Sequence, residues 1–186
     1  CALPICTGWS NGGVTIQTNQ TTSPANTNTA DLLTANADNA GVYQGFSCTS
    51  GTAYTWSVYA KANTGDSLRI KAQATSTVAA FIFNLTNVTA TLSAGAGTAT
   101  ITSVGNGWYR CTVTATATAT GTGYHEINIS TNTKSMYFWG AQLETGAFAT
   151  SYIPTTSAAL TRNADVATMT GTNFSDWYNE IGRAHV

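Results

Sequence analysis

Residues 53–62 read AYTWSVYAKA. Alternate side chains of an extended chain point to opposite faces. One face then carries Tyr54, Trp56, Val58 and Ala60, and the other carries Thr55, Ser57, Tyr59 and Lys61. An apolar face opposite a largely polar one is typical of a strand that covers a hydrophobic core on one side. We therefore predict a β-strand here, with its first face in the core.

Similar alternating runs recur along the chain between clusters of Gly, Asn and Ser. No stretch from 13 to 144 keeps a 3.6-residue period over three turns, so no helix is predicted there. Further strands are predicted near 13–18, 29–34, 41–48, 67–74, 79–85, 98–104, 107–118, 124–130 and 135–144. Eight to ten strands without crossover helices indicate an all-β fold, an antiparallel β-sandwich with its sheets packed face to face.

The composition argues against several classes of partner. Charged residues make up 8% of the chain, seven basic against eight acidic, so no strong field attracts nucleic acid or anionic lipid. No apolar run approaches the roughly 20 residues that cross a bilayer, and the start lacks the pattern of a signal peptide. The four cysteines match no metal-site spacing and are expected to be free thiols.

The chain is expected to hold one sandwich over residues 1–152. A linker is predicted over 153–179, where Phe174, Trp177 and Tyr178 either begin a second domain or fold back to cap the sandwich. Residues 180–186, EIGRAHV, read as the translation of a short-read sequencing adapter and are set aside as an assembly scar from a metagenomic contig. The first residue is Cys1 and not Met, which suggests a fragment whose true amino terminus lies upstream.

Four motifs resemble a module that recurs in bacteriophage tail, head-fibre and other virion surface proteins. They are GNGWYRC (105–111), WGAQLETG (139–146), ATSYIPT (149–155) and TRNADV (161–166). The resemblance implies a jelly-roll sandwich similar to carbohydrate-binding modules. It also implies a protein of the virion surface that is made in the bacterial cytoplasm, a reducing compartment that agrees with free thiols. Other virion chains, or further copies of this chain in a fibre, are then its expected partners.

A structural calcium is common in sugar-binding jelly rolls, and the resemblance makes Asp31 and Glu144 its candidate ligands here. The predicted last strand, however, lacks the adjacent acids that related modules place there.

The outward faces of the predicted strands gather aromatic and charged side chains. Sugar recognition uses flat aromatic faces against C–H surfaces and planar polar groups against paired hydroxyls. The candidate carbohydrate-binding residues are Tyr59, Arg69, Lys71, Trp108, Arg110, Tyr124 and Glu126, with Lys61, Gln73 and Asn128 on the same outward faces. Two other interpretations stay open, because a solvated strand face or a contact with a neighbouring protomer would look the same.

Several aromatic residues have structural interpretations of their own. Trp108 follows a Gly-Asn-Gly turn and can cover the end of the sandwich. Tyr137 and Trp139 share parity with Leu143 and are predicted to lie in the core. His125 is predicted to point inward as a structural residue with its polar atoms satisfied.

An enzyme is not expected. Glycoside hydrolysis needs two carboxyl groups flanking one bond, and Glu126 with Glu144 is the best pair that the few acids allow. No Ser/His/Asp set, His-rich metal spacing or phosphate-binding glycine loop is present. We therefore expect a non-catalytic module that binds a host-surface glycan, the alternative being a purely structural or oligomerising virion domain without a ligand.

Overall fold

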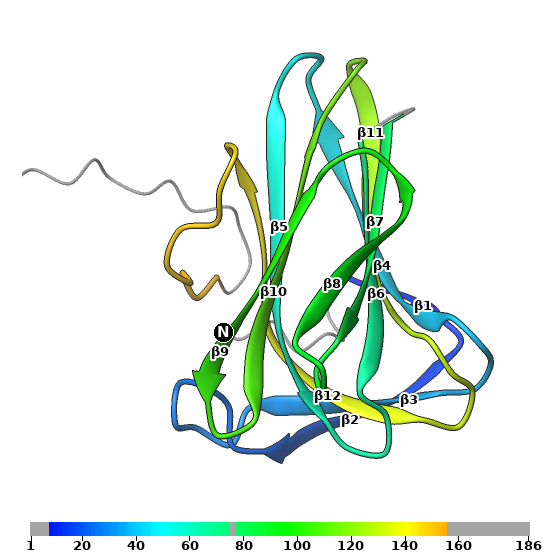
Figure 1. Cartoon of the computed structure of the whole chain (residues 1–186), viewed down its shortest axis with the longest axis vertical. Helices are drawn as coiled ribbons and strands as arrows, with labels where there is room; N and C mark the ends of the chain where they lie inside the picture. The colour runs from blue at the N-terminus through cyan, green and yellow to red at the C-terminus, as the bar shows by residue number, and fades with distance from the viewer. Residues whose placement is uncertain (1–7, 75–76, 156–186) are drawn as a thin grey trace, which may run out of the picture.

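The computed structural model describes residues 8–74 and 77–155, which form two six-stranded antiparallel sheets (Figure 1). In spatial order, sheet A consists of β1 (Ser10–Gly12), β4 (Ala40–Cys48), β11 (Gly121–Ile129), β6 (Ser67–Ala74), β7 (Thr77–Asn84) and β8 (Thr89–Gly95). Sheet B consists of β2 (Val14–Thr21), β3 (Ala30–Ala35), β12 (Ser135–Thr145), β5 (Ala53–Ala62), β10 (Trp108–Thr116) and β9 (Thr98–Gly105). The described part of the chain contains no helix that could cross a membrane.

The predicted all-β sandwich is confirmed, and each predicted strand is present. Two strands were not predicted, β1 and β8. Strand β1 is only three residues long, and in β8 every residue except Ala90 is exposed. The sequence of β8 does alternate, with Ala90, Leu92 and Ala94 between hydroxyl residues, but two of these three apolar side chains are only methyl groups, so the segment lacks the large apolar face that signals a half-buried strand.

The core lies between the two sheets. Trp56 and Val58 of β5 face Leu68 and Ile70 of β6 across it, and these four side chains are at most 1% exposed. The predicted inward face of β5 is thus confirmed, and so is the predicted outward direction of Arg69 and Lys71, which alternate with Leu68 and Ile70 on β6. The inter-sheet core also includes Cys111 and Val113 of β10, Ile127 and Ile129 of β11, and Met136 and Phe138 of β12.

Strand β12 changes phase in its middle. Trp139 pairs with Tyr59, but Gln142 pairs with Ser57, so one extra residue is accommodated between them as a β-bulge. Gly140 lies in this bulge with φ +60°, a conformation that favours glycine. The prediction that Tyr137 and Trp139 lie on the core face with Leu143 was therefore wrong, because the bulge breaks the parity between these two residues and Leu143. Trp139 packs on the outer side of sheet B and Leu143 packs against the core.

The segment 146–155 folds back over the outer face of sheet B, where Figure 1 shows it in orange beside β5. The Thr55 hydroxyl donates to the Gly146 carbonyl, and the Ile153 amide donates to the Gln142 side chain. Thr55 and Ser57, which point outward as predicted, are consequently fully buried. Residues 153–155 of the predicted linker belong to this segment, whereas 156–179 and the scar 180–186 lie outside the described residues.

The cysteines agree with the prediction where they are described. Cys48 and Cys111 are buried free thiols, and burial raises the pKa of the Cys111 thiol. Cys1 and Cys6 lie outside the described residues.

Candidate functional site

The seven predicted carbohydrate-binding residues lie on two different surfaces. Arg69, Lys71, Tyr124 and Glu126 project from the outer face of sheet A, whereas Tyr59, Trp108 and Arg110 project from the outer face of sheet B. These faces point away from each other across the sandwich (Figure 1). The predicted residues therefore do not form a single site, because side-chain parity does not tell which sheet a strand joins.

Trp108 is a structural residue of sheet B. Its side chain is 2% exposed, and its indole N–H donates to the Thr22 carbonyl at 3.1 Å. It forms a separate apolar cluster with Ala30 and Trp139 on the outer side of the sheet. Trp108 points away from the inter-sheet core as predicted, but other side chains and the loop after β2 cover it. It cannot serve as a platform for a sugar ring.

Tyr59 and Arg110 hold the segment 146–155 in place. The Arg110 guanidinium lies 5.4 Å from the centre of the Tyr59 ring and donates to the Thr150 carbonyl at 2.7 Å and the Ser57 hydroxyl at 2.9 Å. Tyr152 of the segment packs edge-on against Tyr59, and burial together with Tyr59 raises the pKa of the Tyr152 phenol. The polar atoms of Arg110 that a sugar would need are thus largely in use.

A groove of about 460 Å³ remains on this side, between residues 147–149 and strands β9 and β10. Tyr59 and Arg110 form part of its lining, together with threonine side chains and Phe148, which is 73% exposed. The groove is poor in planar polar groups. The groove is therefore a weaker candidate for a sugar-binding site than the outer face of sheet A.

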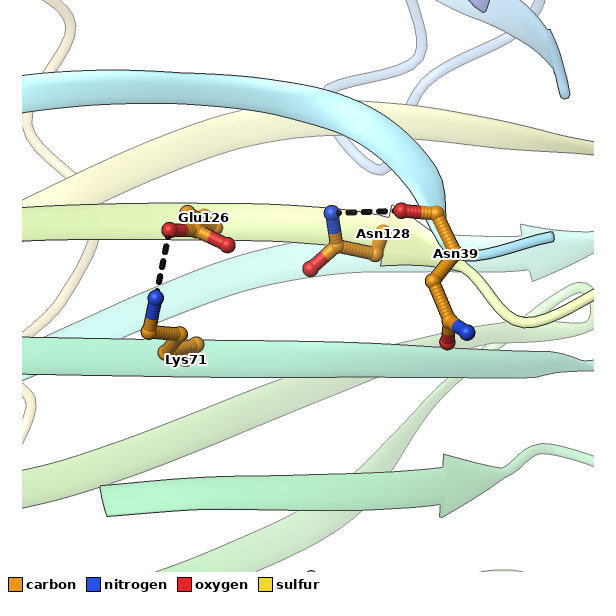
Figure 2. Close-up of polar contacts among 4 residues, drawn as sticks. All are labelled: Asn39, Lys71, Glu126 and Asn128. Carbon is orange, nitrogen blue, oxygen red and sulfur yellow. Dashed lines mark hydrogen bonds and ion pairs between the residues drawn. The ribbon is translucent and has the colours of Figure 1, made fainter. Parts of the chain in front are cut away.

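The outer face of sheet A offers the polar groups that the groove lacks. On β11, Glu126 lies opposite Tyr43 of β4 on one side and Lys71 of β6 on the other. The Lys71 ammonium donates to a Glu126 carboxylate oxygen at 2.8 Å, and both side chains keep more than a fifth of their surface exposed (Figure 2). This pair presents donors and an acceptor to solvent at the middle of the sheet.

Two tyrosines flank this ion pair. Tyr43 is 39% exposed and Tyr124 is 40% exposed, and the register places them diagonally across β4 and β11. Gly41 and Gly45 precede and follow Tyr43 on the same face of β4, so no neighbouring side chain of that strand screens its ring. Tyr43 was not among the predicted site residues. The alternation of GVYQG from 41 to 45 nevertheless places it on the other face of the strand from Val42, and thus outward.

The remaining polar residues of the face belong to β6 and β11. Gln73 lies opposite Tyr124, and Arg69 lies opposite Asn128. The Asn128 amide donates to the Asn39 carbonyl at 3.1 Å (Figure 2), while its side-chain oxygen is buried with no hydrogen-bond partner in the described part of the chain. We call Tyr43, Arg69, Lys71, Gln73, Tyr124, Glu126 and Asn128 the polar face.

The two predicted calcium ligands do not lie together. Asp31 pairs with Phe138 near the start of β12, and Glu144 lies near its other end, about 17 Å away at roughly 3.3 Å per residue of the partner strand β5. Asp31 is buried and accepts from the Asn19 amide. Glu144 accepts from the amide and hydroxyl of Thr150. Among the described residues no three His, Cys, Asp or Glu side chains gather around a common point, so we propose no calcium site.

His125 lies directly beneath the polar face, between Tyr124 and Glu126 on β11. It points into the core as predicted and stacks on Trp56 with 4.0 Å between ring centres. The prediction that its polar atoms are satisfied was wrong, because neither ring nitrogen has a partner within residues 8–74 and 77–155. Burial lowers the pKa of His125 to about 3, so the imidazole is neutral at physiological pH.

The sequence matches no protein-family model and no curated protein sequence. Solved structures nevertheless share the fold. The enzymatically active domain of bacteriophage CBA120 tailspike protein 4 is 14% identical with a TM-score of 0.52, over 77% of this chain and 20% of that one. The xylanase 10B modules of Clostridium thermocellum, complexed with xylohexaose, are 16% identical with a TM-score of 0.51, over 80% of this chain and 28% of that one.

The carboxy-terminal family 22 carbohydrate-binding module of the same xylanase is comparable in size to this chain. It is 14% identical with a TM-score of 0.51, over 78% of this chain and 90% of that one. The jelly-roll sandwich, similar to carbohydrate-binding modules, is therefore the fold of this chain.

Proposed function

We propose that this chain is a non-catalytic, carbohydrate-binding module of a bacteriophage virion surface protein. Its ligand would be a glycan of the host surface, bound along the polar face of sheet A. The observation that carries the proposal is the open pair Tyr43 and Tyr124 around the Lys71–Glu126 ion pair. Aromatic rings cover the C–H surfaces of sugars, and planar charged groups bond paired hydroxyls.

The fold and the motifs support the two parts of this proposal. Among the structural neighbours is a module described as carbohydrate-binding, and another neighbour is a phage tailspike domain. The resemblance of residues 105–166 to virion surface modules supports the phage context. The scarcity of acids supports a binding role, since Glu126 is the only acidic residue of the six strands of sheet A.

The test is a screen of the full chain against immobilised bacterial surface polysaccharides. We expect binding to at least one polymer, a loss of binding in Tyr43→Ala and Tyr124→Ala, and unchanged binding in Phe148→Ala. The last variant is the matched control, because Phe148 is an exposed aromatic residue on the sheet B side. Loss of binding in Phe148→Ala with retention in the two tyrosine variants would move the site to the sheet B groove.

The alternative is a structural domain that spaces or oligomerises a fibre. The observation that favours it is the edge strand β8, which carries no charged residue or proline and is exposed over nearly its whole length. Edge strands of this kind pair readily with another chain. A folded sample that binds no glycan and sediments as an oligomer would favour this function over the first.

A further inference from the structure

The charges of the polar face are unequal. Arg69 and Lys71 are its basic residues, and Glu126 is its acidic residue. Lys71 and Glu126 neutralise each other in a 2.8 Å ion pair (Figure 2). Arg69 has no hydrogen bond or ion pair to any part of residues 8–74 and 77–155, although its side chain is only partly exposed. The face therefore keeps one uncompensated guanidinium.

We infer that the glycan bound on this face is anionic, with a carboxylate or phosphate group that pairs with Arg69. This inference rests on the proposed function and names its ligand class. A guanidinium presents its N–H groups in a rigid fork that matches the two oxygens of such an anion. A neutral sugar would leave the positive charge of Arg69 without a counter-charge.

The neighbours of Arg69 fit this role. Its cross-strand partner Asn128 has a buried side-chain oxygen without a donor. One Arg69 N–H can satisfy this acceptor and still leave others for an anion, because arginine has five donors. On the other side, Ile82 is the cross-strand neighbour of Arg69 and adds no competing carboxylate.

The overall charge of the chain makes this local group decisive. The formal net charge is −1 at pH 7, so the protein as a whole does not attract anions. Selection of an acidic polymer must then come from a particular contact, and its strength should fall as salt rises. The selected polymer lies over Tyr43 and Tyr124, which supply contacts that do not depend on salt.

The experiment measures affinity of the full chain for paired polysaccharides. One pair is a uronic-acid polymer and its carboxyl-reduced form, which keeps the backbone and loses the charge. A second arm is a phosphodiester-linked sugar polymer, which distinguishes phosphate from carboxylate. The variants are Arg69→Gln, Arg69→Lys, and the control Lys134→Gln, which removes an exposed positive charge outside the strands of sheet A.

We expect an acidic polymer to bind, and we expect affinity to fall by about tenfold or more on carboxyl reduction or in Arg69→Gln. Arg69→Lys should retain part of the affinity, and Lys134→Gln should retain all of it. Binding confined to the phosphodiester polymer, with the same variant effects, supports the inference with phosphate as the anion.

Two outcomes would overturn the inference, and they differ in what they say of the proposed function. Equal binding of charged and reduced polymers, unaffected by Arg69→Gln, would refute the anionic ligand and leave carbohydrate binding intact. Absence of binding to every polymer, charged or neutral, by the folded chain would refute both.

Discussion

The outer faces of the two sheets carry similar residues but use them differently. On sheet B, Trp108 and Arg110 are engaged by the loop after β2 and by segment 146–155. On sheet A, Tyr43 and Tyr124 remain open at about 40% exposure. An aromatic or basic residue on an outward strand face is therefore a binding candidate only after the chain that crosses that face has been accounted for.

The largest expected effect concerns the covered face. Trp108→Ala should lower the free energy of unfolding by about 3–5 kcal/mol, because it removes a buried indole and leaves a cavity. Tyr124→Ala on the open face should cost less than about 1 kcal/mol. Urea unfolding of both variants at pH 7 measures the two values. Equal costs would remove the distinction between a covered and an open face.

Lowering the pH tests the inner side of sheet A, where His125 lies beneath the polar face. Its pKa is about 3 in the folded chain and near the ordinary 6.5 when unfolded, so the unfolded state binds the proton first as pH falls. The stability that the neutral imidazole contributes is fully present above pH 6.5, and it is lost progressively as the pH falls toward 3. Between pH 7 and 4.5, about 2–3 kcal/mol should be lost on this account.

The measurement for His125 is urea unfolding at both pH values in the wild type and in His125→Leu. Both proteins contain the same other titrating groups, so the contribution of these groups cancels in the comparison. The free energy of unfolding of the variant should therefore fall less between the two pH values, by the stated amount. The same loss in both proteins would mean that folding does not lower the pKa of His125.

Arg110 and Arg69 form a matched pair across the sandwich. Arg110→Ala should lower the free energy of unfolding by about 1.5–3 kcal/mol, because it removes charge-assisted hydrogen bonds to Ser57 and Thr150. Arg69→Ala should stay within about 0.5 kcal/mol, as expected at an unpaired surface position. Limited proteolysis should also cut segment 146–155 faster in Arg110→Ala. Cleavage at the wild-type rate would contradict the holding role of Arg110.

The smallest effect is expected for the Lys71–Glu126 ion pair. A double-mutant cycle with Lys71→Ala and Glu126→Ala should give a coupling energy of about 0.2–1 kcal/mol that falls with salt, because both side chains are partly solvated. A coupling above about 2 kcal/mol would indicate a shielded pair that is less available to a ligand.

Much of the fold followed from local alternation, because parity depends only on neighbouring residues. The inward face of β5 and the outward residues of β6 were predicted correctly, as were the antiparallel sheets. The grouping of Tyr59 and Arg110 with Arg69 was wrong because sheet membership depends on which distant strands pair. The position of Trp139 was missed because the bulge at Gly140 resets parity, and strand alternation alone does not report an extra residue.

The bulge in β12 also limits how the length of this strand can change during evolution. Phe138 and Trp139 are consecutive and both buried, one between the sheets and the other under the loop after β2. Deleting Gly140 would remove the bulge and restore simple alternation with Leu143 still facing the core, whereas a one-residue change that leaves the bulge in place would turn Leu143 outward. In a family of such domains, the spacing from Trp139 to Leu143 should therefore change only together with the bulge, while insertions gather in turns such as the one around Gly51, where nothing lies within 4 Å of an added Cβ.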